Sequence, residues 1–158
     1  MKSITPELKN HIQKLDSIQE RLEFLKDKYK DETAYIVTCG PSLKKHDINE
    51  LRKKLKNKLV ISIKQAYNVV KNETDFHILN TWNLSEYNWL DNSIVYWSLA
   101  KSYANEQLQR ILDMKAPIDL FIPVINLPYI NYNQTVQATC NFDDFYMMET
   151  HTEVKFGI

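Results

Sequence analysis

The residue types best suited to binding a phosphate-bearing ligand lie in three short segments, each of which directly follows an apolar run. Together the segments supply turn amides, a hydroxyl group, a lysine cation and side-chain amides, and they comprise Cys39, Gly40, Pro41 and Ser42, then Lys64 and Gln65, then Asn80 and Thr81. Such groups recognise phosphate, ribose and nucleobases. The three segments therefore predict a nucleotide-binding site.

Gly40 is one of only two glycines in the chain, and the other is Gly157. It follows the apolar run 35–39 and precedes Pro41, whose ring fixes φ and removes one N–H group. Because glycine permits a positive φ and a close approach by a ligand, we expect one of these at Gly40. The alternative is a tight connection in which Ser42 bonds a local backbone group.

Several familiar motifs are absent around Gly40. No Gly-Lys-Ser/Thr follows it, no further glycine completes G-x-G-x-x-G, and no G-x-S-x-G elbow is present. A capping box at Asp47–Glu50 begins a helix several residues later. A phosphate would therefore meet the N–H groups of the turn more than a helix dipole.

Two further positions each have a functional and a structural interpretation. Lys64 ends an apolar run, so it either extends to solvent or contacts an anion. Asp75 and His77 lie two residues apart on a predicted strand and could suggest a metal pair. No third ligand is evident, so we predict that Asp75 caps the strand, that His77 is a structural histidine, and that there is no metal site.

Short apolar runs alternate with helical patterns along most of the chain. The predicted strands span residues 34–39, 59–63, 76–79, 94–97 and 120–125, and the predicted helices span 48–55, 65–70 and 105–114. Strands that alternate with helices form parallel sheets, and nearly continuous apolar strands indicate cover on both faces. We predict an α/β fold in which a parallel sheet with flanking helices gathers the three polar segments at one edge. One short helical piece is expected at 142–147.

A separate helix is predicted at the N-terminus. Thr5 caps its start, Pro6 takes the first helical position, and one apolar stripe follows, made of Leu8, Ile12, Leu15, Ile18, Leu22 and Leu25. We expect one long amphipathic helix over residues 1–30, ahead of a domain over 33–158. The stripe could pack within the chain, which is the commoner outcome, or mediate self-association through a partner helix.

The composition excludes several classes of protein. The 158 residues include twenty basic and twenty acidic ones, so no general affinity for nucleic acid is expected. No apolar run approaches the ~20 residues of a membrane span, and no signal peptide is visible. Cys39 and Cys140 have no zinc-type spacing and do not suggest a disulfide. We expect a cytoplasmic protein of one main domain.

The run Ile36–Leu43, followed by Asp47, resembles the opening strand and loop of a Rossmann-like superfamily. That superfamily includes Campylobacter-type sialyltransferases, motility-associated glycosyltransferases and hydroxymethylpterin diphosphokinase-like proteins. Its loop typically reads Gly-x-Gly-Pro-Ser-Leu, and Thr38 stands here in place of the first glycine. The segments 63–67 and 75–80 look like its second and third strands. The resemblance covers residues 34–83.

The resemblance implies a Rossmann-like domain that binds a nucleotide-sugar donor, either a CMP- or a UDP-sugar, and transfers the sugar to a hydroxyl acceptor. Its donor site would include Cys39, Gly40, Pro41, Ser42, Lys64, Gln65, Asn80 and Thr81, with the Gly40 turn on the phosphates. No cofactor is required in the sialyltransferase branch. The reaction needs a general base, for which His151, in a polar stretch between two glutamates, is the candidate.

Two alternatives remain open. A pterin or nucleotide diphosphokinase-like enzyme would need Mg²⁺ and a carboxylate cluster, of which Asp75 is the only evident member near the loops. A non-catalytic structural or interaction module agrees with the N-terminal stripe and with a chain that ends where the family's second ligand loop would begin, near Gly157. A natural short form, a fragment and a split gene product are all compatible with that end.

Overall fold

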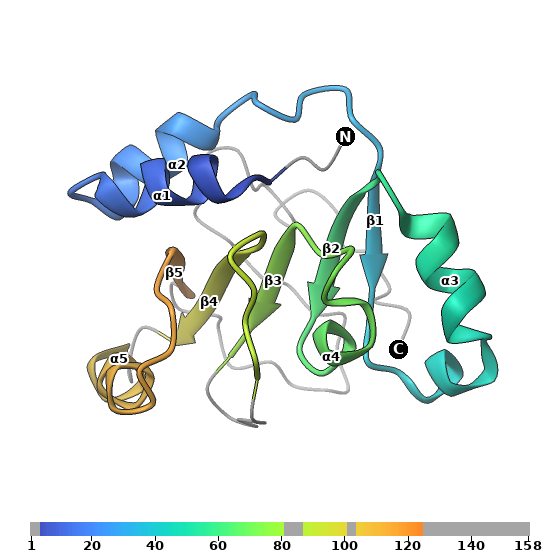
Figure 1. Cartoon of the computed structure of the whole chain (residues 1–158). Coiled ribbons are helices and arrows are strands. Elements are labelled where there is room, and N and C mark those ends of the chain that lie inside the picture. The colour runs from blue at the N-terminus through green and yellow to red at the C-terminus, as the bar shows by residue number, and fades with distance from the viewer. Residues whose placement is uncertain (1–3, 81–86, 101–103, 125–158) are drawn as a thin grey trace, which may run out of the picture.

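The computed structural model describes residues 4–80, 87–100 and 104–124, which form a five-stranded parallel sheet with helices packed against it (Figure 1). The strands are β1 (Ala34–Val37), β2 (Leu59–Ile63), β3 (Phe76–Leu79), β4 (Ile94–Ala100) and β5 (Leu120–Val124). Each strand pairs with the next, so their spatial order is their order along the chain. The predicted α/β fold with a parallel sheet is therefore confirmed.

The helices that lie between successive strands pack on one face of the sheet. They are the 3₁₀ helix η1 (Pro41–Lys45), α3 (Ile48–Leu55), α4 (Ala66–Val70) and α5 (Ala104–Asp113). At the far end of the sheet, Ile111 of α5 packs with the buried side chains of β4. A sequential strand order with right-handed crossovers puts every connection on the same face.

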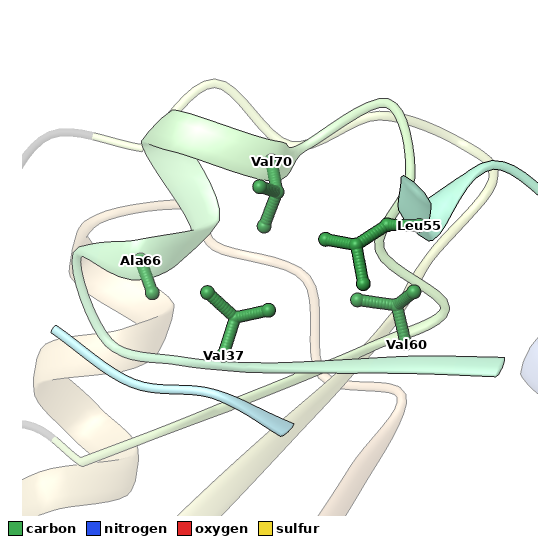
Figure 2. Close-up of a cluster of buried hydrophobic side chains, with 5 residues drawn as sticks. All are labelled: Val37, Leu55, Val60, Ala66 and Val70. Atoms are coloured by element: carbon green, nitrogen blue, oxygen red, sulfur yellow. The ribbon is translucent and has the colours of Figure 1, made fainter. Parts of the chain in front are cut away.

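A compact apolar cluster fixes the first two connections in place (Figure 2). Side chains from four elements point toward one another, namely Val37 of β1, Leu55 of α3, Val60 of β2, and Ala66 and Val70 of α4. All are at most 8% exposed. Because burial of apolar area is the main stabilising contribution, at about 25 cal/mol per Å², this cluster holds the ends of β1 and β2 in a fixed relation.

The opposite face is covered near β4 and β5 by α1 (Pro6–Lys14) and α2 (Ile18–Leu25) (Figure 1). Ile12 is fully buried against Ile94 and Leu120, and several half-buried side chains of the two helices surround this cluster. The apolar stripe of the N-terminal segment therefore packs within the chain.

The prediction of one long N-terminal helix was wrong, because the segment forms two helices. Leu15 ends α1 with an extended ψ of 135°, and Ser17 begins α2 with a capping box. The Ser17 Oγ accepts a hydrogen bond from the Glu20 N–H, and the Glu20 carboxylate accepts one from the Ser17 N–H. The S-x-x-E pattern at Ser17–Glu20 is the sequence signal for a second helix start. It was overlooked because the apolar stripe continues through both helices.

Most other element boundaries agree with the sequence prediction. The bounds of β2, β3 and α3 are those expected, whereas β1 ends two residues earlier and β4 extends three residues further. The predicted helical piece at 142–147 lies outside the described residues. Among the helices of the described ranges, none is long and apolar enough to cross a membrane.

Candidate functional site

A pocket of about 560 Å³ lies at the C-terminal edge of the sheet, between the segment after β1 and the start of α4. It is lined by Cys39, Gly40, Pro41, Leu43, Lys44 and Ile48 after β1, and by Gln65, Ala66 and Val69 after β2. Parallel sheets bind ligands at this edge, and ligand pockets typically have volumes of roughly 300–1,000 Å³. Two of the three predicted segments therefore meet in one cavity of suitable size.

The pocket wall is mainly apolar with a few polar groups. Leu43, Ile48 and Val69 provide aliphatic surface, while Lys44 and Gln65 provide a cation and an amide. The Lys44 side chain is exposed and makes no ion pair or hydrogen bond within the described ranges. An apolar wall with few polar groups suits a ligand that has both a planar or aliphatic part and an anionic part.

Of the two reasons expected for a glycine at position 40, the structure excludes a positive φ. Gly40 has φ −66° and ψ 156°, an extended conformation that the residue before a proline favours. A Cβ added there would lie 3.8 Å from Ser42 Oγ and 3.9 Å from Thr38 Oγ1, which is ordinary contact. Neither backbone strain nor crowding by neighbouring atoms requires a glycine at this position. The other expected reason, close approach by a ligand, is still compatible with the structure because Gly40 lines the pocket.

The turn after β1 offers backbone donors. The N–H groups of Gly40 and Ser42 donate to no acceptor in the part of the chain that is described, whereas the Leu43 N–H donates to the Gly40 carbonyl at 3.0 Å. The start of α3 is already satisfied, because the Asp47 carboxylate accepts from Asn49 N–H at 2.9 Å and from the next N–H at 3.1 Å. A phosphate in the pocket would therefore meet turn amides rather than the end of α3.

Lys64 has an unusual backbone conformation at the end of β2. Its φ is 49°, in the left-handed region that costs an L-residue roughly 1–2 kcal/mol. Its carbonyl accepts hydrogen bonds from the His77 Nε2 at 3.0 Å and from the Tyr67 N–H at 3.1 Å. Its own N–H donates to the Ile78 carbonyl at 2.9 Å. Surrounding groups thus hold the strained turn that leads into α4.

His77 is the structural histidine that its sequence context predicts. It is fully buried in β3, stacks on Tyr67 with ring centroids 4.3 Å apart, and accepts a hydrogen bond at Nδ1 from the Trp89 indole at 3.0 Å. Because an indole N–H only donates, Nδ1 is unprotonated and Nε2 donates to the Lys64 carbonyl. Burial lowers the pKa of His77 from 6.5 to about 4, so the ring is neutral at pH 7.

Asp75 lies at the opposite edge of the sheet from the pocket, where it caps the start of β3 as predicted. Its carboxylate accepts hydrogen bonds from the Val60 N–H at 2.8 Å and from the Ile4 N–H at 3.2 Å. Asp75 and His77 therefore bind separate partners. Within the described ranges, no group of three or more His, Cys, Asp or Glu residues could hold a metal ion.

The remaining predicted site residues have mixed outcomes. Cys39, Gly40, Pro41 and Gln65 line the pocket, whereas Ser42, Lys64 and Asn80 are described but are not among its lining residues. Thr81 and His151 lie outside the described residues. The sequence analysis missed Lys44, although it directly follows the Gly-Pro-Ser-Leu turn, and it missed the aliphatic wall from α3 and α4.

Comparison of the chain with protein-family models, with curated proteins and with solved structures finds no significant match. The resemblance to the sialyltransferase superfamily therefore stays a prediction.

Proposed function

We propose that this chain is a nucleotide-sugar-binding domain of the glycosyltransferase type, and that the pocket between η1 and α4 holds the nucleotide. The observation that carries the proposal is a pocket of about 560 Å³ lined jointly by the segments after two successive parallel strands. Its aliphatic wall suits a base and a ribose. The Lys44 cation, the Gln65 amide and the unpaired N–H groups of the turn suit phosphates.

The strand order is compatible with a Rossmann-like domain. In a doubly wound sheet the order reverses beside the first strand, and ligands bind at that reversal. Here β1 is the edge strand of the described sheet, and β2 to β5 follow it in one direction. In such a fold, the described strands would form one side of the sheet, with the pocket at the end of its first strand.

Calorimetric titration tests the binding function. CMP, UDP and their sugar conjugates are added to the full chain, with and without Mg²⁺, and Lys44→Ala and Gln65→Ala are compared with Lys54→Ala. Lys54 is exposed on α3, pairs only with Glu50 among the described residues, and does not line the pocket. We expect metal-independent binding that each pocket variant weakens about tenfold and that Lys54→Ala leaves unchanged.

Protection of Cys39 against alkylation gives an independent measure of where the ligand binds. Cys39 is an exposed free thiol that lines the pocket, and a Cys140→Ser background leaves it as the sole cysteine. Bound nucleotide should slow its reaction with iodoacetamide. Unchanged alkylation at saturating ligand would place the nucleotide elsewhere. Binding only with Mg²⁺ would support the diphosphokinase-like alternative, and no binding would support the non-catalytic module.

Sugar transfer to an acceptor hydroxyl, with His151 as general base, is the second part of the proposal. It is tested by release of CMP or UDP from the bound donor in the wild type and in His151→Ala. Self-association through the N-terminal segment also stays a prediction, and sedimentation at several concentrations tests it. The packing of Ile12 against β4 and β5 leaves less of the stripe for a partner helix.

A further inference from the structure

We propose that His77 is a positioning residue for the candidate nucleotide site, acting by holding Lys64 in its left-handed backbone conformation and so fixing the turn that brings Gln65 to the pocket. The mechanism stands on geometry alone. Its consequence for ligand binding rests on the proposed function. His77 itself does not line the pocket.

The turn that His77 supports differs from the other strained positions in the chain. Five described residues other than glycine have a positive φ, and Lys64, with φ 49°, is the one that directly follows a strand. The other four are Asp27, Asp31, Asn57 and Lys115. Gln65 and Ala66, the next two residues, both line the pocket. A change of φ at Lys64 would therefore redirect one wall of the site.

The Lys64 carbonyl is the group through which His77 acts. It accepts from the His77 Nε2 at 3.0 Å and from the Tyr67 N–H at 3.1 Å, so both bonds require the carbonyl direction that the left-handed conformation provides. Losing the side-chain donor would leave the Lys64 carbonyl with one hydrogen bond, in a backbone conformation that an L-residue otherwise disfavours. The turn would then populate other backbone conformations.

The imidazole is well suited to this role because its own orientation is fixed on three sides. Trp89 donates to Nδ1, which sets the tautomer that donates from Nε2. Tyr67 stacks on one face at an interplanar angle of 12°, and Tyr87 meets the ring edge-on with centroids 4.8 Å apart. Tyr67 is in turn held by the Leu90 N–H, which donates to its hydroxyl at 2.9 Å. Neighbouring side chains that are themselves held by hydrogen bonds keep the His77 imidazole in a fixed orientation.

The Lys64 side chain adds a cation next to the pocket-lining residues Gln65 and Ala66, although Lys64 itself does not line the pocket. Its ammonium group makes no hydrogen bond or ion pair in the described part of the chain. A cation at a strand end beside a pocket is available to an anionic ligand. The bond from His77 fixes where that side chain leaves the backbone.

A thermodynamic cycle with His77→Phe and Lys64→Gly tests the mechanism, because glycine adopts a positive φ without support. In a protein that keeps the wild-type Lys64, we expect His77→Phe to weaken nucleotide affinity about tenfold. In the Lys64→Gly background, the same substitution should weaken it less than about twofold. An equal loss in both backgrounds would overturn the proposal, since a general structural defect is independent of the residue at 64.

A ligand-free measurement separates this inference from the proposed function. Hydrogen exchange of the Tyr67 amide, which donates to the Lys64 carbonyl, should accelerate about tenfold in His77→Phe and little in the double variant. If the wild type binds no nucleotide but this pattern appears, the positioning role stands and the proposed function fails. If exchange does not change, the positioning role fails whatever binds.

Two milder variants keep the test decisive if His77→Phe does not fold. The Nε2 of His77→Gln can reach the Lys64 carbonyl in place of the imidazole Nε2, whereas the shorter His77→Asn cannot. We expect His77→Gln to retain slow Tyr67 exchange and His77→Asn to lose it. Equal behaviour of the two variants would contradict the proposal. His11→Phe, on the exposed side of α1, is the control for substituting a histidine.

Discussion

Charged side chains at the N-terminal edge of the sheet are buried and bonded, whereas two lysine side chains at the C-terminal edge have no ion pair among the described residues. At the N-terminal edge, Asp75 and Asp119 are fully buried, and each bonds a backbone N–H of the preceding strand. At the C-terminal edge, Lys44 and Lys64 have uncommitted ammonium groups within the described ranges. The two edges therefore differ in how their charged groups are used, because those at the N-terminal edge are committed to internal contacts and, in the part of the chain that is described, the two lysines at the C-terminal edge are not.

The N-terminal edge joins the first helix to the last described strand. Lys9 is 5% exposed and forms an ion pair with Asp119 at 3.3 Å while donating to the Ser93 carbonyl at 2.8 Å. The same carboxylate accepts from Gln13 at 2.7 Å. Arg21 donates to the carbonyls of Asp119 and its neighbour at 2.9 and 2.8 Å. Charged groups buried with this many partners are structural, because removing one of them leaves the others buried without a partner.

The comparison teaches that residue type alone does not distinguish polar groups committed to the fold from polar groups that are open to solvent or a ligand. Asp75 and His77 have the residue types of a catalytic or metal site, yet all their described contacts are internal. Gly40 and Lys44 are chemically plainer, but they line the pocket and have free hydrogen-bonding capacity. Proteins keep such groups only where a ligand or solvent satisfies them.

The largest expected effect is at the N-terminal edge. Lys9→Met should lower the free energy of unfolding by about 3–5 kcal/mol, because the Asp119 carboxylate stays buried without its cation. Urea unfolding followed by circular dichroism measures the change, and Lys14→Met on the exposed side of α1 should change stability little. Ligand affinity of the folded fraction should be unaltered. Equal stability of the two variants would show that the buried charged groups at the N-terminal edge do not stabilise the fold.

A pH-dependent loss of stability is expected next in size. The His77 pKa is lowered from 6.5 to about 4 by burial, so between these values the unfolded chain binds a proton that the folded chain excludes. The contribution of His77 to the free energy of unfolding is therefore fully present above about pH 6.5. It is lost as the pH falls toward 4, and the total loss is about 3 kcal/mol. Unfolding free energies measured across this range in the wild type and in His77→Gln should converge at low pH. A wild-type curve parallel to that of His77→Gln would contradict a buried neutral histidine.

A smaller effect of opposite sign is expected at the C-terminal edge. Lys64→Gly should raise the free energy of unfolding by up to about 1 kcal/mol, because relief of the left-handed strain exceeds the added chain entropy. Lys56→Gly is the matched control, since Lys56 has φ −56° and gains nothing from glycine. It should destabilise by roughly 0.5–1 kcal/mol. Destabilisation by both variants would show that Lys64 is unstrained. Ligand affinity of Lys64→Gly should nevertheless fall.

The smallest effect on stability is expected at Gly40. Gly40 has an extended backbone conformation, and a Cβ added there would make only ordinary contacts, so a side chain at this position need not impair folding. Gly40→Ala should change the free energy of unfolding by less than about 0.5 kcal/mol. Calorimetry should show weaker nucleotide binding if the ligand contacts this backbone. Unchanged affinity would show that the glycine has no role in the pocket.

Features with a repeating pattern could be predicted from the sequence, whereas features made by single contacts could not. Continuous apolar runs marked the strands, and the Asp47 cap marked the start of α3, so the edge that gathers Gly40 and Gln65 followed from the parallel sheet. No periodicity distinguishes the buried Lys9 from a solvated lysine on α1. The left-handed Lys64 likewise depends on His77, a partner supplied by the neighbouring strand.

The sequential strand order has a consequence for synthesis of the chain. Each of β2 to β5 pairs with the strand made just before it, so the sheet can grow from its first edge as the polypeptide leaves the ribosome. The contacts of the N-terminal segment are the exception, because Ile4 and Asp75 are 71 positions apart and Gln13 and Asp119 are 106 apart. Among these contacts, the Lys9–Asp119 ion pair would then form last. A ribosome-bound chain that ends before β5 would hold a partial sheet whose first helix lacks its contacts with Asp119 and Leu120.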